Sequence, residues 1–316
     1  MTVADIGEFG LIDRITARLG ARAAGPGVLL GPGDDAAIVA APDGRVIAST
    51  DVLVDGRHFR SDWTSATDVG HRAAAANLAD IAAMGATPTA LLVALCAPPD
   101  LDVAWAEGLA DGLASEAASA GAAVVGGDIS ASPVLTIAVT ALGNLDGAAP
   151  VLRSGARPGD VVAVAGRLGY AAAGLALLNR GHRNPAALVD AYRRPVVPYP
   201  AGPAAGRLGA TAMLDVSDGL LADLGHIADA SGVAIDVRRD AFEVAALLAD
   251  AAGALGADPY QWVLTGGEDH ALAATFRPDT ALGVEWRVIG RVAAGAGVTV
   301  DGQPYADAPS GWDHFR

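Results

Sequence analysis

The amino-acid sequence predicts an α/β protein of two domains, covering residues 1–147 and 148–316. Its 316 residues suffice for about two domains of ordinary size. The composition is 52% hydrophobic but only 5% aromatic, and it is rich in alanine and glycine, which indicates a folded chain rather than a disordered one. Short apolar runs typical of strands alternate with alanine-rich segments typical of helices.

The first half is predicted to begin with a helix over about 9–20, followed by a strand hairpin. Two apolar runs flank Pro42-Asp43-Gly44, and Asp-Gly between such runs is a strong hairpin signal. Such a hairpin places Asp34 and Asp35, in the stretch GPGDDAAIV, opposite Ser49-Thr50-Asp51. The alternative interpretation of this stretch is an ordinary turn, since Gly, Pro and Asp are turn residues.

An alanine-rich helix is expected over about 66–84, with Ser65 or Thr67 at its start and Gly85 after its end. Asp80 lies inside this helix, and the residues three and four positions away offer it no salt-bridge partner. The carboxylate therefore either faces water or has a partner from another element, because burying it alone is unfavourable.

The rest of the first half is predicted to hold one more helix and two strands. The helix covers about 102–120, and the strand after it runs into Gly126-Gly127-Asp128. A further strand follows over 133–143.

The second half repeats the order strand, glycine-containing turn, helix. Over 161–178 the glycines do not match G-x-G-x-x-G, so we interpret them as packing residues rather than a dinucleotide site. Over 211–232 the segment Asp215-Val216-Ser217-Asp218-Gly219 joins a strand to a helix, where Ser217 or Asp218 can cap the helix or line a phosphate site. An apolar run, two glycines and an acidic pair recur in WVLTGGEDHALAATF, over 262–276.

The balance of charge argues against nucleic acid as a partner. The formal net charge is −15, and the arginines form no basic stripe. No apolar run reaches the ~18 residues that cross a bilayer, and the first residues lack the features of a secretory signal. Cys96 is the single cysteine, which excludes a disulfide framework. We therefore expect a cytoplasmic protein with neither nucleic acid nor membrane as a partner.

Acidic motifs recur at predicted loop edges, namely GDD, STD, GGD and DVSDG, with Asp80 on a helix. Hard oxygen ligands of this kind suit Mg²⁺, which keeps water ligands and shares its coordination shell with substrate phosphates. The sequence has no EF-hand spacing, no zinc-type His and Cys cluster, no G-x-x-x-x-G-K-[ST] and no protein-kinase motifs. Phosphoryl transfer by this chain would therefore depend on several magnesium ions instead of a P-loop lysine.

Nine short motifs follow one another along the chain in the order GEFGLI, GPGDDAA, STDVLVDGRHF, NLADIAAMGA, VVGGD, RSGARPGD, LDVSDGLLADLGHI, TGGEDHAL and GWDHF. Together they span Gly7 to Phe315 and resemble the thiamine-monophosphate kinase family. That family is similar in fold to aminoimidazole ribonucleotide synthetase, selenide water dikinase and the hydrogenase maturation dehydratase.

The resemblance implies a two-domain aminoimidazole ribonucleotide synthetase-like fold. Its N-terminal α/β domain binds ATP and magnesium and forms a β-barrel with the same domain of a second copy in a homodimer, and its C-terminal domain is α+β. The implied reaction is the ATP-dependent phosphorylation of thiamine monophosphate to thiamine diphosphate, in thiamine diphosphate biosynthesis. Transfer is direct and in line, with no covalent enzyme intermediate. The attacking phosphate oxygen is already ionised, so no general base is expected.

The resemblance also assigns site residues, carried over motif by motif. The residues implied to hold magnesium are Asp35, Ser49, Thr50, Asp51, Asp80, Asp128, Asp215 and Asp218. The residues implied to contact ATP are Asp35, Gly127, Asp128, Arg153 and Ser217. The residues implied to contact the thiamine phosphate are His58, Glu268 and Trp312. The number of ions, a proton transfer by His58 and the roles of Asp34 and Asp269 stay open.

Two alternatives remain. The chain could be another ATP-dependent enzyme of the same fold family, although it has no cysteine near the N-terminal glycine loop or at the C-terminus, where two of those enzymes need one. It could also be a sensor that binds Mg-ATP without turnover, for which the substrate-side residues His58, Glu268 and Trp312 would serve no purpose.

Overall fold

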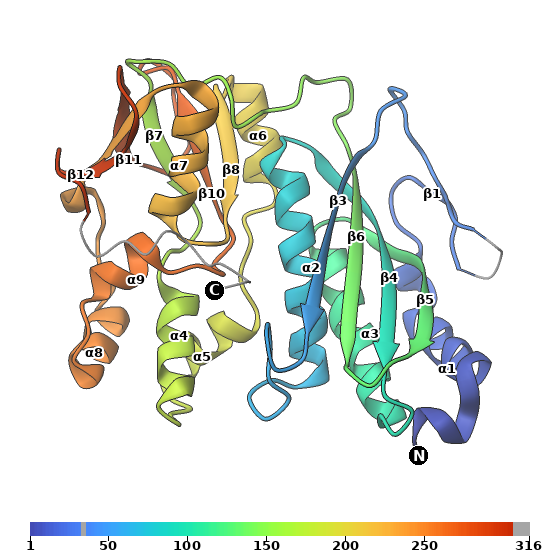
Figure 1. Ribbon diagram of the computed structural model, residues 1–316. Helices are drawn as coiled ribbons and strands as arrows, with labels where there is room; N and C mark the ends of the chain where they lie inside the picture. Colours follow the sequence, from blue (N-terminus) through green and yellow to red (C-terminus); the bar gives the residue numbers. More distant parts are fainter. Residues whose placement is uncertain (33–35, 306–316) are drawn as a thin grey trace. The chain divides into compact units, whose positions relative to one another are not determined.

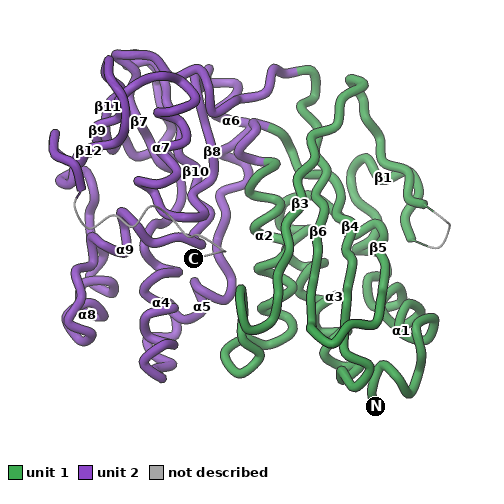
Figure 2. Tube along the Cα trace, viewed as in Figure 1, with its two compact units in different colours: residues 1–81, 86–147 green, residues 82–85, 148–316 purple. Residues whose placement is uncertain are grey.

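The computed structural model describes residues 1–32 and 36–305. The chain forms two compact units: unit 1 comprises residues 1–81 and 86–147, and unit 2 comprises residues 82–85 and 148–316 (Figure 2). Each unit combines helices with a β-sheet (Figure 1), as expected of an α/β protein. Among the described residues, no helix has both the length and the apolar character needed to cross a membrane.

Unit 1 is built on a four-stranded sheet in the order β3-β6-β4-β5. These strands cover Ile47–Val54 (β3), Thr87–Ala97 (β4), Ala123–Ala131 (β5) and Thr136–Asn144 (β6). Strand β6 is antiparallel to both β3 and β4, whereas β4 and β5 are parallel. The chain passes through helix α2 (Ala66–Ala83) from β3 to β4, and through helix α3 (Val103–Ser119) from β4 to β5.

Helices α2 and α3 approach each other closely and cover one face of this sheet (Figure 1). A Cβ atom on Gly70 would lie 2.3 Å from the Leu109 carbonyl oxygen, and one on Gly112 would lie 2.1 Å from the Thr67 carbonyl oxygen. Only glycine therefore fits at these two positions. Helix α2 also packs on β6, where a Cβ on Gly143 would meet Ile81 at 2.2 Å.

The two faces of the sheet differ in burial, as strand β6 shows. Residues 137, 139 and 141 are buried, whereas residues 138, 140 and 142 are half-exposed. Because side chains alternate along a strand, the buried set points towards the helices and the other set lies on the opposite face. We call this second surface the open face. It also carries Val52 and Leu92, which are 47% and 38% exposed.

The helices of unit 1 confirm the sequence-based predictions where local signals are strong. Helix α2 ends close to the predicted boundary, and Ser65 and Asp68 cap its start by accepting each other's backbone N–H, at 3.2 and 2.9 Å. Helix α3 also matches its prediction. Helix α1 (Val3–Leu19) begins earlier than expected. A bend at Gly7, whose φ is 68°, separates its first residues from the rest, so the regular helical period in the sequence begins only after this bend.

The hairpin predicted between residues 35 and 51 is wrong. Strand β2 (Ile38–Val39) pairs with β1 (Val28–Leu30), while β3 pairs with β6 over its full length. A turn does form where it was expected, since the Gly44 N–H donates to the Ala41 carbonyl at 3.0 Å. The strands leave it in different directions because Val28 and Val39 pack against the buried cluster of Ala90, Ala123 and Val125.

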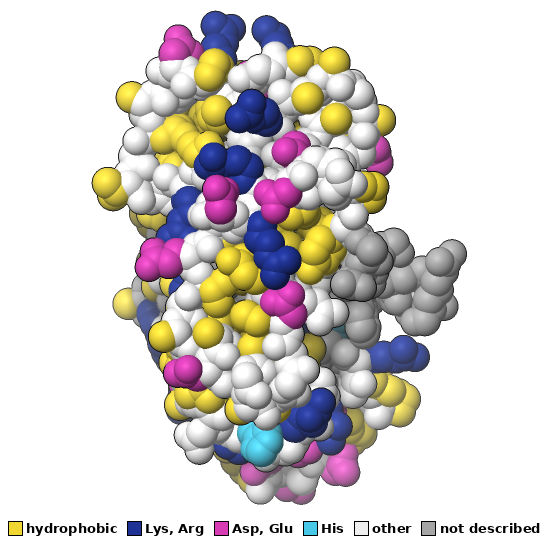
Figure 3. Space-filling view, turned by 90° about the vertical axis from the view of Figure 1, so that its left-hand side faces the viewer, with side chains coloured by type: hydrophobic (Ala, Val, Ile, Leu, Met, Phe, Trp, Pro, Cys, Tyr) yellow, Lys and Arg dark blue, Asp and Glu magenta, His cyan; other side chains and the backbone are white. Residues whose placement is uncertain are grey.

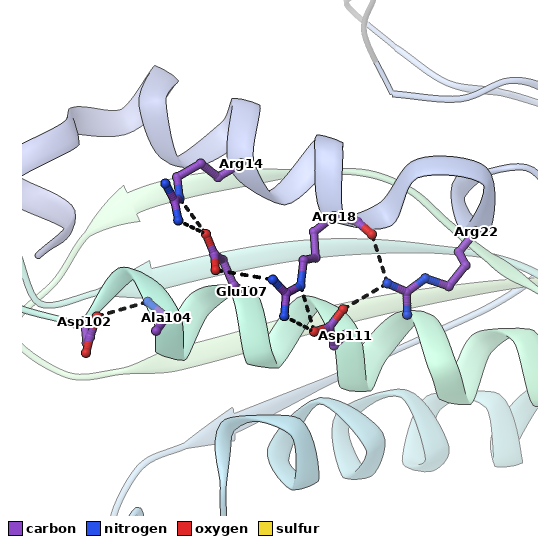
Figure 4. Close-up of polar contacts among 7 residues, drawn as sticks. All are labelled: Arg14, Arg18, Arg22, Asp102, Ala104, Glu107 and Asp111. Atoms are coloured by element: carbon purple, nitrogen blue, oxygen red, sulfur yellow. Dashed lines mark hydrogen bonds and ion pairs between the residues drawn. The ribbon is translucent and has the colours of Figure 1, made fainter. Parts of the chain in front are cut away.

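A ladder of charged residues fastens α1 and the short 3₁₀ helix η1 (Gly20–Ala23) to α3 (Figure 4). Arg14 pairs with Glu107, and Arg18 lies 3.5 Å from Glu107 and 2.8 Å from Asp111. Arg22 also contacts Asp111, at 2.9 Å. Hydrogen bonds from Arg18 and then Arg22 hold the pKa of the Asp111 carboxyl below its usual range. The ladder sets the position of α1 along α3.

Unit 2 contains a six-stranded sheet in the order β12-β9-β11-β7-β10-β8. The strands cover Val161–Ala165 (β7), Ala212–Val216 (β8), Ala234–Val237 (β9), Ala271–Phe276 (β10), Trp286–Ala293 (β11) and Gly297–Val300 (β12). The helices cover Tyr170–Asn179 (α4), Ala186–Arg193 (α5), Ala201–Leu208 (α6), Leu220–Ser231 (α7), Ala246–Leu255 (α8) and Pro259–Thr265 (α9), with the 3₁₀ helix η2 at Arg239–Ala241. All strand pairs are antiparallel except β9 and β12. Phe276 and Trp286 pack edge to face in the core, with ring centroids 5.1 Å apart.

Basic and acidic side chains are interspersed on the surface drawn in Figure 3. In unit 2, Arg239 contacts Asp258 at 3.2 Å and Arg238 lies 3.9 Å from Asp240. Neighbouring carboxylates thus offset much of the charge of these arginines, in agreement with the acidic composition of the chain.

Candidate functional site

In unit 1 the structure brings Ser49 and Asp80 together. The Ser49 hydroxyl donates to Oδ2 of Asp80 at 2.6 Å, which joins strand β3 to helix α2. Asp80 is half-buried. The sequence left open whether this carboxylate faces water or has a partner from another element, and the second alternative is correct.

Strand β3 directs the Ser49-Thr50-Asp51 triplet to two faces of the sheet. Ser49 and Asp51 lie opposite the buried residues 141 and 139 of β6, so both share the helix-covered face with Asp80. The Asp51 backbone N–H donates to Oδ1 of the buried Asn77 on α2, at 3.0 Å. Thr50 lies on the open face, where its hydroxyl contacts that of Thr140 at 3.1 Å.

Gly127 and Asp128 lie on β5, at the far edge of the sheet from β3. The strands β6 and β4 lie between them, so the main chains of β3 and β5 are about 14 Å apart at about 4.8 Å per strand. Asp128 pairs in register with Ala94 of the open face. The structure therefore does not bring Asp128 to the Ser49 and Asp80 pair, and these residues cannot ligate the same ion within one chain.

A cavity of about 1170 Å³ lies beside Gly127 and Asp128. Its walls come from α1, α3 and strands β4, β5 and β6, and most of the side chains that line it are apolar. Gly31 and Pro32 also line it, so the described start of the GPGDD stretch reaches this cavity. A site of this size and apolar character is typical of those that hold a small organic ligand.

His58 is half-buried in the loop after β3. Its Nδ1 accepts the Val54 backbone N–H at 3.0 Å. The neutral imidazole ring therefore carries its proton on Nε2, which makes that nitrogen the donor.

Three residues of interest fall on parts of the chain that the structure does not describe. Asp34 and Asp35 belong to residues 33–35, and Trp312 belongs to residues 306–316. The metal and ATP roles expected of Asp35 and the substrate role expected of Trp312 thus lie outside the described residues.

In unit 2 the segment from Asp215 to Gly219 lies directly beside the segment from Gly267 to His270. The Glu268 N–H donates to the Ser217 carbonyl at 2.8 Å, and the His270 N–H donates to the Val216 carbonyl at 3.0 Å. A Cβ on Gly267 would lie 2.1 Å from the Ser217 carbonyl oxygen, so glycine is required at this position. The structure thus brings the segment that contains Asp215, Ser217 and Asp218 next to the segment that contains Glu268.

Asp223 is a further member of this group that the sequence reasoning missed. It lies in the first turn of α7 and is 4% exposed, and its carboxylate accepts the backbone N–H groups of Asp218 and Gly219, both at 3.1 Å. Burial, followed by the negative charges of Asp215 and Asp218, raises the pKa of the Asp223 carboxyl to about 7. Gly219 is the N-cap of α7, so the prediction that Ser217 or Asp218 caps this helix is wrong. An acidic residue in the first helical turn was the signal that could have identified Asp223.

Asp269 binds the start of helix α4. It is 5% exposed, and its carboxylate accepts the backbone N–H groups of Gly169 at 2.6 Å and Ala171 at 2.9 Å. Burial raises the pKa of the Asp269 carboxyl to about 6, although the two N–H donors act in the opposite direction. The residues on either side, Glu268 and His270, have φ values of 71° and 50°, which non-glycine residues rarely adopt.

Arg153 is not brought to Ser217 by the fold of unit 2. Its neighbour Leu152 accepts the Met213 N–H at 3.1 Å, at the start of β8, whereas Ser217 follows the end of that strand. Met213 and Ser217 are four residues of extended chain apart, which is about 13 Å. The Arg153 carbonyl accepts from the Ser231 hydroxyl at 3.1 Å, and its side chain is exposed.

The carboxylate and hydroxyl oxygens of the candidate residues are donors that fit magnesium. Among the described residues, no three His, Cys, Asp or Glu side chains are arranged to enclose a metal ion. Mg²⁺ is commonly held by one or two carboxylates together with water and phosphate oxygens, and the carboxylates of Asp80 and Asp215 are donors of this kind. The mutual repulsion of Asp215, Asp218 and Asp223 is also the kind that a bound cation relieves.

Comparison with known proteins matches both halves of the chain to related families. Residues 33–145 match the family described as AIR synthase related protein, N-terminal domain, and residues 157–303 match AIR synthase related protein, C-terminal domain. Thiamine-monophosphate kinase of Mycobacterium tuberculosis strain H37Rv is 51% identical over 321 residues, which cover 99% of this chain and 93% of that protein.

Solved structures agree with these matches. The crystal structure of thiamine-monophosphate kinase from Stenotrophomonas maltophilia K279a has a TM-score of 0.83 at 36% identity, covering 95% of this chain and 98% of that one. The structure of AaThiL complexed with AMPPCP and TMP has a TM-score of 0.81 at 34% identity, covering 100% and 99%. The described fold is therefore the expected aminoimidazole ribonucleotide synthetase-like fold, and the chain belongs to the thiamine-monophosphate kinase family.

Proposed function

We propose that this protein is an enzyme that phosphorylates thiamine monophosphate to thiamine diphosphate with ATP, in thiamine diphosphate biosynthesis. The family relationship over the whole chain supports this activity. The structural observation that carries it is the main-chain pairing of the Asp215–Gly219 segment with the Gly267–His270 segment. The pairing supports the proposal because Glu268, a carboxylate suited to the positive thiazolium ring, lies next to Ser217 in this pairing.

We propose Mg²⁺, several ions of it, as the cofactor and ATP as the co-substrate. When bound, the metal neutralises charge on the transferring phosphoryl group. In unit 1, Ser49, Asp51 and Asp80 share one face of the sheet and would supply one set of ligands, with Thr50 and Asp128 on the other face. In unit 2 the ligands would be Asp215 and Asp218. The expected role of Asp35 belongs to the same proposal.

Because the sequence contains no lysine, phosphate recognition in this chain would depend on arginine, histidine, serine and backbone N–H groups. We propose that Gly127, Asp128, Arg153 and Ser217 contact ATP. A guanidinium group forms paired hydrogen bonds with phosphate oxygens, so the exposed side chain of Arg153 suits this role. The cavity beside Gly127 offers apolar walls that suit an adenine ring.

On the acceptor side, the Nε2–H group of His58 would donate to the phosphate of thiamine monophosphate. Glu268, whose side chain is 45% exposed, would face the thiazolium charge, and Trp312 would offer its ring face to the same cation. The attacking phosphate oxygen is ionised at neutral pH, so direct in-line transfer needs neither a general base nor a covalent intermediate.

We further propose a homodimer joined through the open face of the unit 1 sheet. This face exposes Val52 and Leu92 beside half-buried residues of β6, and apolar surface of this kind is typical of an interface. Residues 1–147 would then form the domain for ATP, magnesium and dimerisation, and residues 148–316 the C-terminal α+β domain. We place the enzyme in the cytoplasm, where ATP is available and where a single unpaired cysteine is common.

One assay tests the central proposal. The purified chain is incubated with Mg-ATP and thiamine monophosphate, and thiamine diphosphate is measured by chromatography. Formation of this product, dependent on Mg²⁺, is expected. Binding of Mg-ATP without product would support the sensor, and consumption of ATP only with other acceptors would indicate another enzyme of the fold family.

A further inference from the structure

His270 is a buried histidine at the junction between the Gly267–His270 segment and strand β10. The residue is 4% exposed, and its φ of 50° lies in the left-handed region. Backbone of this kind is unfavourable for a histidine and persists only where surrounding contacts hold it. The contacts that the imidazole makes therefore indicate why a histidine is present.

The imidazole lies between two carboxylates. Its Nδ1 is 3.0 Å from Oδ2 of Asp215, and its Nε2 is 4.0 Å from Oε2 of Glu268. A carboxylate oxygen can only accept at neutral pH, so Nδ1 carries the proton and donates to Asp215. The histidine thus donates a hydrogen bond to a candidate metal ligand and lies close to a candidate substrate residue.

Asp215 needs such a donor because it is 6% exposed and close to other negative charges. Asp218 and Asp223 belong to the same group of carboxylates, and the N–H groups that Asp223 accepts come from the loop after Asp215. A buried carboxylate without hydrogen bonds is strongly disfavoured and would turn towards any available donor. The hydrogen bond from His270 is made to Oδ2 of Asp215, so this bond determines which oxygen of Asp215 is held by the protein.

We propose that His270 is a positioning residue for magnesium binding: its Nδ1–H group holds Oδ2 of Asp215 and leaves Oδ1 as the ligand atom. This inference rests on the proposed metal role of Asp215. Carboxylates that bind metals are usually held by hydrogen bonds of this kind, and their loss typically weakens metal affinity or activity about 10- to 100-fold.

The test compares three substitutions at this position. His270→Asn keeps an N–H donor at the distance of Nδ1, and asparagine tolerates the positive φ. His270→Gln carries its donor one bond further out, and His270→Leu removes it. The exposed His226 on α7 supplies the matched control, His226→Leu. Magnesium binding is read from the rise in melting temperature during a Mg²⁺ titration with a non-hydrolysable ATP analogue.

We expect His270→Leu and His270→Gln to raise the half-saturating Mg²⁺ concentration about 10-fold or more, and His270→Asn to stay within about threefold of the parent chain. The His226→Leu variant should titrate like the parent. If His270→Leu folds and binds Mg²⁺ like the parent, the proposal is overturned. It is overturned equally if His270→Asn loses as much affinity as His270→Gln, a comparison that remains valid should the leucine variant fail to fold.

The Asp215→Asn variant, measured in the same Mg²⁺ titration, distinguishes failure of this inference from failure of the proposed function. Weakened Mg²⁺ binding by Asp215→Asn together with normal binding by His270→Leu overturns the His270 proposal alone. Normal binding by Asp215→Asn overturns both the metal role of Asp215 and the inference that depends on it. Neither readout needs turnover of thiamine monophosphate, so failure of the proposed reaction would be seen separately in the product assay.

Discussion

Ser49 on β3 donates a 2.6 Å hydrogen bond to Asp80 on α2, and so joins two residues that are 31 positions apart in the chain. The hydroxyl hydrogen is directed to the carboxylate, which leaves the lone pairs of the serine oxygen for a cation. The hydrogen bond thereby holds a strand residue and a helix residue together on the helix-covered face of the sheet.

Removing the serine hydroxyl should weaken magnesium binding. In Ser49→Ala the Asp80 carboxylate loses its donor, and we expect the Mg²⁺ concentration for half-maximal activity to rise about 10-fold or more. Steady-state rates measured over a Mg²⁺ series check this. Thr89→Ala is the matched control, because this hydroxyl of the same sheet donates only to the Leu142 carbonyl. Identical Mg²⁺ curves for both variants would contradict the proposed role of the pair.

Asp51→Asn should abolish most activity without unfolding the protein. The side chain is exposed, and the hydrogen bond to Asn77 comes from the Asp51 backbone, so the substitution retains that bond. Loss of a charged ligand should lower kcat by at least about 100-fold. Circular dichroism and melting verify folding, and the exposed Asp100→Asn serves as the control. Near-normal turnover by Asp51→Asn would show that this end of β3 holds no metal.

We expect Gly127 to be required for the packing of strands β4 and β5, independently of any contact with ATP. A Cβ atom there would lie 1.9 Å from the Val93 carbonyl oxygen, so strands β4 and β5 would have to separate. We expect Gly127→Ala to lower the free energy of unfolding by about 1–3 kcal/mol. Its neighbour gives the control, since a Cβ on Gly126 meets only the flexible tip of Leu92, at 3.3 Å. Urea unfolding compares the two, and equal losses would refute the steric explanation.

The buried Asp269 should make stability fall as pH rises. Its pKa is about 6 in the folded protein against an ordinary value of 3.8, so the folded state binds this proton more tightly. The stabilisation is full below pH 3.8 and is lost as the pH rises through about 6, by at most about 3 kcal/mol. Urea unfolding between pH 4 and 7.5 should show the parent chain losing stability relative to Asp269→Asn. A difference that does not change with pH would contradict the prediction.

The sequence predicted helices α2 and α3 well because their signals are local. Ser65 and Asp68 mark the start of one helix within four residues, and Gly85, with a φ of 74°, follows its end. The local structure around the unit 2 candidates was also predictable, since strand β8, the acidic loop and helix α7 follow one another directly along the chain.

Pairing between distant strands could not be predicted from local pattern. The turn at Asp43-Gly44 suggested a hairpin, but the partner of β3 is β6, and Thr50 lies opposite Thr140, 90 residues away. Asp80 illustrates the same limit, because its partner Ser49 becomes a neighbour only in the folded sheet. His270 escaped notice since nothing in GGEDH indicates that its ring contacts Asp215.

The alternation of side chains along β3 makes this strand sensitive to length rather than only to composition. Deleting one residue between Gly44 and Ala48 would rotate every later side chain to the other side of the sheet, if β3 kept its hydrogen bonds with β6. Ser49 and Asp51 would then lie on the open face, away from Asp80, and Thr50 would lie on the helix-covered face. Every amino acid of the triplet would still be present in the chain, yet the arrangement on which the proposed metal site depends would be lost.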